Sequence, residues 1–305
     1  MSARKTVTFY LHDTLRRQAE RGHHNFIGKV RAVLQAAGFT IAYDSDDVAA
    51  RLRARGRLGR ALHLMDDPVN DRGLAFRKTY LYPFWHIEKQ GTRWDWPVAR
   101  AGFDPTAVDH RKSANFFRFW RKRLFDDAAI HARQDGFIFV PLQGQLSRRR
   151  SFQSCSPIDM IKTILHCDPN RQVMATLHPN ETYSAEDQRA LEDLLVANDR
   201  LFVRLGDAPR FLQACDYVVT QNSGVGLLGY FFEKPLILFG RSDFHHIALN
   251  VQDIGAPAAF ERVQSHRPDY AAYLHWFLQE QAINAGRPEA EIRIREVLQS
   301  HGWPV

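Results

Sequence analysis

Residues 220–240, TQNSGVGLLGYFFEKPLILFG, are the stretch that decides the fold. The pattern predicts the end of a strand, a small polar turn at residues 221–224, an apolar helix over residues 225–232 and another strand over residues 236–239. The first amide N–H groups of a helix have no partner within the helix, so a turn of this kind can bind an anion. Strand, turn, helix and strand in this order are typical of a parallel α/β sheet.

The chain on either side of this stretch alternates strands and helices in two series. The second series has predicted strands over residues 136–142, 172–177, 201–205 and 217–220, with helices over residues 157–165, 184–198 and 209–214. Its strands are rich in Val, Ile, Leu and Phe, as parallel strands buried on both faces tend to be. The first series has predicted strands over residues 7–11, 39–43 and 61–65, with helices over residues 25–37 and 48–55.

Between the two series lies an aromatic region with a long predicted helix over residues 113–134, and closing helices are expected over residues 269–284 and 288–300. We therefore predict an α/β protein with two Rossmann-like domains that face each other across a cleft. The predicted segments are a first domain over residues 1–135, a second over residues 136–265 and closing helices over residues 266–305.

The composition is that of a globular protein in a reducing compartment. The chain has 305 residues, 45% hydrophobic and 25% charged, and its three cysteines form no CxxC pair. No run approaches 18 apolar residues, and no signal-peptide block follows Met1, so we expect the cytoplasm. The formal net charge of +7 suits an anionic partner, although an Arg-rich composition alone explains it equally well.

Polar residues follow several of the predicted strands at the point where each strand ends. Gln143 follows the strand over residues 136–142, and His178-Pro179 and Glu181 follow the strand over residues 172–177. Because the carboxyl ends of parallel strands meet at one edge of a sheet, these residues and the turn at residues 221–224 should converge on one ligand.

These residues belong to a set of motifs that resembles a known family. The motifs, spread over residues 137–242, are Val140-Pro141-Leu142-Gln143, Ser156-Pro157-Ile158-Asp159-Met160, His178-Pro179, Asn222-Ser223-Gly224-Val225-Gly226, Lys234-Pro235 and Phe239-Gly240-Arg241. In order and spacing they resemble capsule polysaccharide biosynthesis proteins of the Kdo-transferase type, which have the GT-B fold. The His-Pro and Ser motifs also look like those of GT-B sialyltransferases. Relatives often carry two hydroxyl residues where this chain has Asn222-Ser223, and polar or acidic residues where it has Arg148-Arg149-Arg150.

The resemblance implies a metal-independent glycosyltransferase without a cofactor. It would move an acidic sugar such as Kdo from a CMP-sugar, bound by the second domain, to a surface or capsular polysaccharide or a glycolipid held by the first. His178 would donate a hydrogen bond or a proton to the departing phosphate. The rest of the donor site would comprise Gln143, Pro179, Glu181, Asn222, Ser223, Gly224 and Val225.

Ordinary structural roles stay open for the same residues. His178 can cap a strand end, Ser223 can be a helix N-cap, and Gln143 and Glu181 can be solvated loop residues. The general base should come from the first domain, where the candidates are His12, Asp13, His23, His24, Asp66 and Asp67. Of these we select Asp13 and His24.

Competing patterns define the alternatives. Asp44-Ser45-Asp46 has the DxD form of metal-dependent transferases but also suits a helix N-terminus, and His23-His24 or His245-His246 can bind a metal.

Residues 111–123 mix cations with aromatic residues. This pattern fits contact with an anionic membrane at the inner face of the plasma membrane, and it fits nucleic-acid binding less well. The alternative function is a non-catalytic glycan- or lipid-binding accessory protein with a degenerate GT-B fold.

Overall fold

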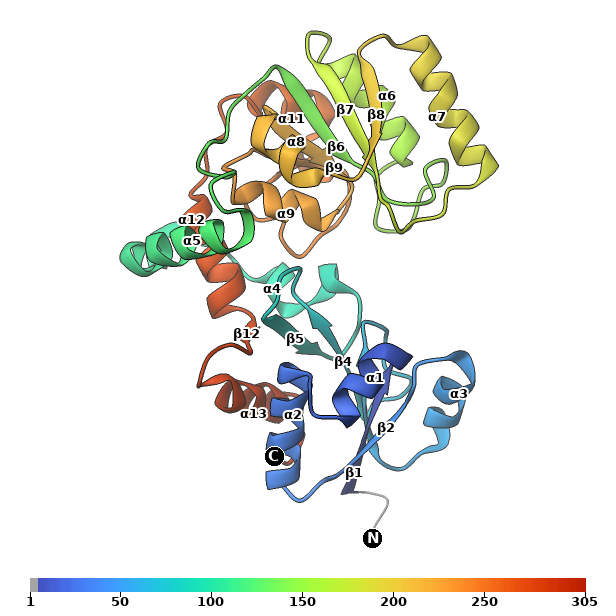
Figure 1. Cartoon of the computed structure of the whole chain (residues 1–305), viewed down its shortest axis with the longest axis vertical. Coiled ribbons are helices and arrows are strands. Elements are labelled where there is room, and N and C mark those ends of the chain that lie inside the picture. Colours follow the sequence, from blue (N-terminus) through green and yellow to red (C-terminus); the bar gives the residue numbers. More distant parts are fainter. Residues whose placement is uncertain (1–4) are drawn as a thin grey trace. The chain divides into compact units, whose positions relative to one another are not determined.

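The computed structural model describes residues 5–305, which form two compact units (Figure 1). Unit 1 contains the segments Met1–Arg100 and Phe277–Val305, and unit 2 is Ala101–Trp276. Each unit has its own six-stranded sheet with helices, which confirms the prediction of two Rossmann-like α/β domains. Residues 1–4 lie outside the described range. They are part of the stretch from which we predicted that no signal peptide follows Met1. Within residues 5–305, no helix has both the length and the apolar character that crossing a bilayer requires.

The sheet of unit 1 has the strand order β12-β5-β4-β3-β1-β2. Its parallel part is built by β1 to β4, and β5 runs antiparallel to both β4 and β12. The strands are β1 (Thr6–Leu11), β2 (Thr40–Ser45), β3 (Arg60–Leu64), β4 (Gly73–Lys78), β5 (Phe84–Glu88) and β12 (Ile283–Asn284). The longer helices are α1 (Asp13–Glu20), α2 (Asn25–Ala36), α3 (Val48–Gly56) and α13 (Ala290–Ser300).

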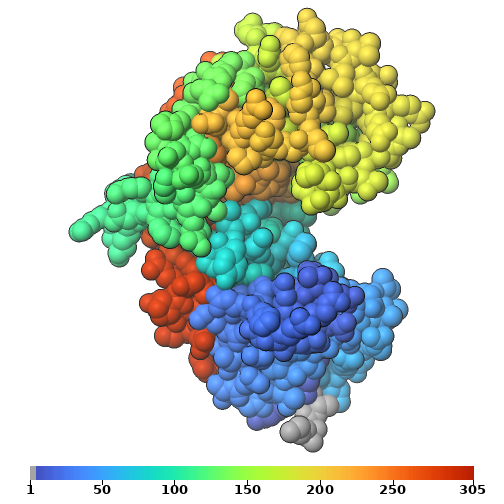
Figure 2. Space-filling model, viewed as in Figure 1, coloured from blue at the N-terminus to red at the C-terminus, as the bar shows by residue number. Residues whose placement is uncertain are grey.

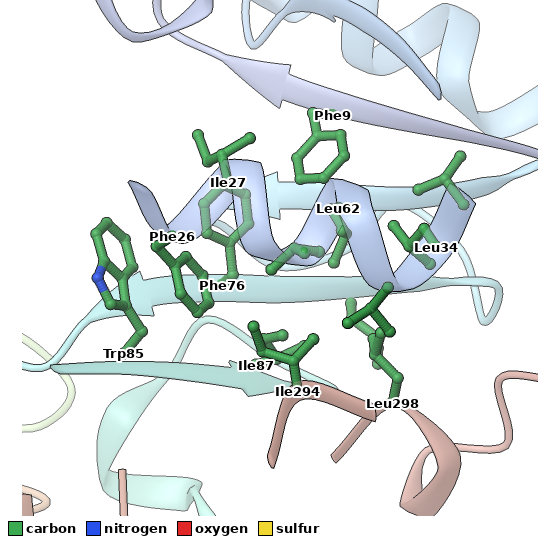
Figure 3. Packing of buried hydrophobic residues seen from close by; sticks show 14 of the residues in the cluster. Phe9, Phe26, Ile27, Leu34, Leu62, Phe76, Trp85, Ile87, Ile294 and Leu298 are labelled. Carbon is green, nitrogen blue, oxygen red and sulfur yellow. The ribbon is translucent and has the colours of Figure 1, made fainter. Parts of the chain in front are cut away.

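The core of unit 1 contains residues from the first ninety and the last thirty or so positions of the sequence (Figure 3). Phe26 of α2 stacks on Trp85 of β5 with ring centroids 4.6 Å apart. Ile294 and Leu298 of α13 are fully buried in the same cluster. The C-terminal helix therefore completes the domain that the N-terminal strands begin.

The sheet of unit 2 is entirely parallel, with the order β11-β10-β9-β6-β7-β8. Its strands are β6 (Phe137–Pro141), β7 (Gln172–Leu177), β8 (Leu201–Leu205), β9 (Tyr217–Thr220), β10 (Leu236–Leu238) and β11 (Leu249–Asn250). The chain runs from β6 to β7 and β8 on one side, then crosses to β9, β10 and β11 on the other. The direction of winding therefore changes between β6 and β9, and ligands of such sheets bind at this switch point.

Helices cover both faces of the unit 2 sheet, as in a doubly wound fold (Figure 1). One face carries α6 (Pro157–Cys167), α7 (Ala185–Ala197) and α11 (Ala256–Arg262), and the other carries α8 (Ala208–Ala214) and α9 (Gly224–Tyr230). Local signals in the sequence explain where these helices begin. Ser156 caps α6, and Ser184 forms the predicted capping box with Asp187 at α7.

The two units differ from the predicted segments because of aromatic contacts between residues far apart in the sequence. Helix α5 (His110–Phe125), predicted in the first domain, packs in unit 2 against α12 (Tyr270–Leu274). Phe117 and Phe125 of α5 contact Phe231 and Phe232 after α9, at centroid distances of 6.1 and 4.7 Å respectively. The closing helices are divided, because α12 lies in unit 2 and α13 in unit 1.

Two predicted helices were too long. The helix predicted over residues 113–134 ends at Phe125, because Asp126 adopts a φ of 50° that a helix cannot continue. The helix predicted over residues 269–284 is α12 followed by a π-helical turn, His275–Glu280, and then β12.

The Lys-Pro pair before β10 has a structural role in unit 2. Lys234 is 4% exposed, and its Nζ donates hydrogen bonds to the carbonyl oxygens of Arg133 (2.5 Å) and Cys215 (2.6 Å). Burial lowers the pKa of Lys234, and nearby charges including Asp216 partly oppose this shift. The ammonium group thereby ties the segment before β6 to the start of β9.

Candidate functional site

The turn after β9 is fixed by hydrogen bonds from its own hydroxyl groups. Ser223 is the N-cap of α9, and its Oγ accepts a hydrogen bond from Val225 N at 3.3 Å. Thr220 Oγ1 accepts from Ser223 N at 3.3 Å and donates to the carbonyl of Pro141 at the end of β6, at 3.2 Å. The turn is thus tied directly to the neighbouring strand. Within residues 5–305, the N–H of Gly224 donates to no acceptor and can serve a ligand.

The amide of Asn222 links the turn to the segment after β10. Asn222 Nδ2 donates to the carbonyl of Arg241 at 3.2 Å. Gly240, which precedes Arg241, approaches two backbone carbonyl groups. A Cβ on Gly240 would lie 3.0 Å from Gln221 O and 3.2 Å from Phe152 O. A side chain at position 240 would crowd both carbonyl oxygens, which favours glycine in the Phe239-Gly240-Arg241 motif. Asn222 keeps its Oδ1 as an acceptor.

His178 stands exposed at the end of β7 with one ring nitrogen already engaged. Its Nδ1 accepts a hydrogen bond from Asn180 N at 3.2 Å, and its backbone N–H donates to Tyr183 Oη at 2.8 Å. The neutral imidazole must therefore carry its proton on Nε2. Within residues 5–305, Nε2–H has no acceptor and can serve a ligand. Pro179 follows it and is exposed.

The loop after β6 closely approaches the loop after β7. The carboxylate of Glu181 lies directly against Gly144, and a side chain at position 144 would have to displace it. Gln143, next to this glycine, is half-buried. The order β9-β6-β7 therefore places the three predicted donor-binding segments on adjacent strand ends of unit 2.

A small cavity lies at the switch point beneath the turn. Its volume is about 10 Å³. Its lining residues are Pro141, Leu142, Gln143, Arg150, Pro157, Met160, Thr220 and Gln221. Besides Gln143, its polar lining residues are Thr220, Gln221 and Arg150. Gln221 lies in the predicted turn at residues 221–224, whereas Arg150 lies outside the predicted site. Nothing in the sequence distinguishes Arg150, which is half-buried, from Arg148 and Arg149, which are exposed.

The predicted general bases lie in unit 1. His24 is the N-cap of α2, with Nδ1 accepting from Ile27 N at 3.2 Å, and burial lowers its pKa. Asp13, in the first turn of α1, is exposed and forms an ion pair with Arg16 at 3.1 Å. The role of either residue as the base stays a prediction.

Three other carboxylates proposed for catalysis or metal binding, Asp44, Asp66 and Asp67, have protein partners. Asp44, of the DxD pattern, pairs with Arg57 at 3.0 Å and Arg53 at 3.6 Å. Asp47 caps α3, as the helix-capping interpretation predicted. Asp67 Oδ1 accepts a hydrogen bond from Gly91 N at 2.6 Å.

Comparisons with known proteins agree with this architecture. The family model for capsule polysaccharide biosynthesis proteins matches residues 111–287, which is more than half of the chain. No curated protein sequence matches. Among solved structures, the β-Kdo 2,7-transferase of KpsC from Thermosulfurimonas dismutans has a TM-score of 0.53 at 13% identity, covering 88% of each chain. The β-Kdo 2,4-transferase of the same KpsC has a TM-score of 0.50 at 11% identity, covering 88% of this chain and 89% of that one. At such identities the likeness shows a shared fold.

Proposed function

This chain belongs to the family of capsule polysaccharide biosynthesis proteins, and from that premise we propose that it is a glycosyltransferase. Its substrates are a CMP-activated acidic sugar and a capsular polysaccharide or glycolipid acceptor. The observation that carries the proposal is the set of polar groups from three adjacent strand ends at the switch point of unit 2. The names of the two similar solved structures support Kdo as the sugar.

The chemistry requires stabilisation of the charge that develops on the departing phosphate. In the neutral ring, Nε2–H of His178 is a hydrogen-bond donor for a phosphate oxygen. In the imidazolium form, Nδ1 carries a proton and gives up the hydrogen bond from Asn180 N, and the Nε2 proton can pass to the leaving group. The N–H of Gly224 provides a second donor, and Ser223 and Asn222 hold the turn in place. Charge stabilisation is thus assigned to protein groups, without a metal. Asp13 or His24 is the proposed base that takes the proton of the acceptor hydroxyl.

A thermal-shift panel of nucleotides tests the donor. CMP at about 100 times its Kd should raise the melting temperature by several degrees, because a ligand that binds only the folded state stabilises it by about 2.7 kcal/mol at that ratio. His178→Ala should reduce the shift, since it removes the donor on Nε2.

Other outcomes of the panel contradict parts of the proposal. A shift with UDP or GDP and none with CMP would overturn the CMP assignment. If no nucleotide shifts the transition while a glycan or a liposome binds, the chain is the non-catalytic accessory protein instead.

We propose further that α5 holds the protein at the inner face of the plasma membrane, where the acceptor is anchored. The helix lies at the surface of unit 2, where its blue-green atoms are visible in Figure 2. Phe116 and Trp120 are buried, whereas Phe119 is 57% exposed. The exposed residues around Phe119 include Arg111, Lys112, Arg118, Lys122 and Arg123. An exposed aromatic ring among cations is typical of a helix at an anionic membrane surface.

Co-sedimentation with vesicles tests this contact. The protein should sediment with vesicles that contain anionic phosphatidylglycerol and much less with phosphatidylcholine alone. Because each cation near the surface contributes about 1 kcal/mol, Arg118→Gln with Arg123→Gln should weaken binding by a factor of about 30. The matched control is Arg189→Gln with Arg210→Gln, two exposed arginines on α7 and α8. Equal binding to both kinds of vesicle would refute membrane contact through charge.

A further inference from the structure

Two polar side chains at the switch point, Arg150 and Gln221, have buried atoms without hydrogen-bond partners. Gln221 is 3% exposed; its Nε2 donates to the carbonyl of Cys155 at 3.0 Å, but its Oε1 accepts from no group among residues 5–305. Nε and Nη2 of Arg150 are likewise buried and unpartnered within the described chain. The guanidinium packs against Phe152, with Cζ 4.9 Å from the ring centroid. Both side chains line the same cavity.

The loop that carries Arg150 is firmly attached to the sheet. Ser154 donates from both N (2.8 Å) and Oγ (2.6 Å) to the carbonyl of Phe239, and Gln153 pairs with Gly240. Ser147 N donates to Asp187 Oδ1 at 2.8 Å. Arg150 itself is held by its N–H, which donates to Gln153 Oε1 at 2.8 Å. The guanidinium is therefore presented to the cavity by a loop that is fixed before any ligand arrives.

The guanidinium makes no ion pair within residues 5–305, and the charge of Glu181 acts on it only from beyond ion-pair distance. Burial lowers the pKa of Arg150, and the charge of Glu181 opposes this shift only in part. No carboxylate among residues 5–305 lies within 4 Å of the guanidinium. A buried charge without a partner is costly, and so is a buried amide oxygen without a donor. A ligand that carries both an anionic oxygen and a hydrogen-bond donor would satisfy both residues.

We infer that Arg150 binds an anionic oxygen of the sugar donor, while Gln221 Oε1 accepts a hydrogen bond from a hydroxyl or amino group of the same molecule. The inference rests on the proposed function. The cavity of about 10 Å³ holds roughly one water molecule, so a single oxygen of a larger group outside can enter it. A CMP-activated acidic sugar offers two sources of such an oxygen, namely the phosphate and the sugar carboxylate. Arg150 is thus a specificity-determining residue that favours an anionic donor.

Calorimetric titration of the full chain tests the inference with CMP, cytidine and free Kdo as probes. If the phosphate is the source, Arg150→Gln weakens CMP binding by a factor on the order of 10 to 100, as expected for a charged hydrogen bond, and leaves cytidine binding unchanged. If the carboxylate is the source, the variant binds CMP as wild type does but loses free Kdo added to the CMP complex. Both results support Arg150 as the anion-binding residue.

Two results would overturn it, and they are distinguishable from each other. If Arg150→Gln binds CMP and Kdo as tightly as wild type does, the role of Arg150 is refuted and the proposed function is left intact. Wild-type protein that binds neither probe would refute the proposed function, and this inference with it.

A matched control separates a ligand-binding role from a structural one. Arg148→Gln removes the same charge from an exposed neighbour in the same loop and should leave all affinities unchanged. Because the Arg150 guanidinium has no hydrogen-bond partner among the described residues, Arg150→Gln should leave the melting temperature of the ligand-free protein unchanged or higher. A lower melting temperature with unaltered affinities would mean that Arg150 only supports the loop.

Discussion

Replacing His178 with alanine should lower kcat for sugar transfer from CMP-Kdo by a factor of about 10² to 10⁴, the usual contribution of a positioned acid. Nδ1 is occupied by the N–H of Asn180, so the ring presents Nε2–H, and only this side can serve the departing phosphate. The imidazole is also exposed, so a substrate can reach it. Release of CMP, followed in steady state with a capsular oligosaccharide acceptor, measures the effect.

Two further variants identify what His178 contributes. His178→Gln can place an amide donor near the position of Nε2 but cannot transfer a proton. Recovery of most of the activity would mean that the hydrogen bond suffices, and its continued loss would identify a general acid. His166→Ala is the matched control. His166 is exposed in the last turn of α6, just before β7, near the amino ends of the strands and away from the candidate site. A kcat of His178→Ala within about twofold of wild type would remove His178 from the chemistry.

The parallel sheet of unit 2 could be predicted almost completely because its signals are local. Strands buried on both faces appear as continuous apolar runs, and helix starts have capping residues just before them. The strand over residues 217–220 was predicted with its observed bounds, and the predicted capping box at Ser184 is present. In unit 1 the strands β4 and β5 were missed, because they lie in an aromatic region whose pattern fits no single period.

The division into units could not be predicted, because it depends on contacts between distant residues. Nothing within α5 indicates that Phe117 stacks on Phe231, more than a hundred positions later. In the same way, α13 has the pattern of an ordinary amphipathic helix, and only the structure shows that it completes the core around Phe26. Periodicity identifies the buried face of a helix but not the surface against which it packs.

The placement of the candidate residues at strand ends could be predicted, whereas their role in binding a donor stays a prediction. The rule that ligands bind at the carboxyl ends of parallel strands selected Gln143, Glu181 and Asn222, and the strand order places these residues on neighbouring strands. The sequence could not show that β6 lies between β9 and β7, nor that the switch point falls between β6 and β9. It also could not show that Arg150 is turned inward, because Arg148 and Arg149, which have the same chemistry, are exposed.

Acidification should destabilise the fold through His63 of β3, a residue outside the proposed site. His63 is 0% exposed and stacks on Tyr10 at 4.6 Å, and neither ring nitrogen has a partner among the described residues. Burial, aided by the charge of Arg51, lowers the pKa of His63 to about 4. The unfolded chain, with a histidine pKa of about 6.5, binds the proton more readily. The free energy of unfolding should therefore fall as the pH drops below about 6.5, by about 3 kcal/mol at pH 4.

Urea denaturation of His63→Phe across this pH range tests the argument. Phenylalanine keeps a ring against Tyr10 but cannot take up a proton, so the loss of stability between about pH 6.5 and pH 4 should be smaller than in wild type by about 3 kcal/mol. Carboxylates that titrate in the same range are common to both proteins and cancel in the difference. Tyr10→Phe is the matched control, because it keeps the stacked ring and His63 and should retain the wild-type pH dependence. Identical pH dependence in wild type and His63→Phe would show that the pKa of His63 is the same in the folded and unfolded states, contrary to the effect expected from its burial.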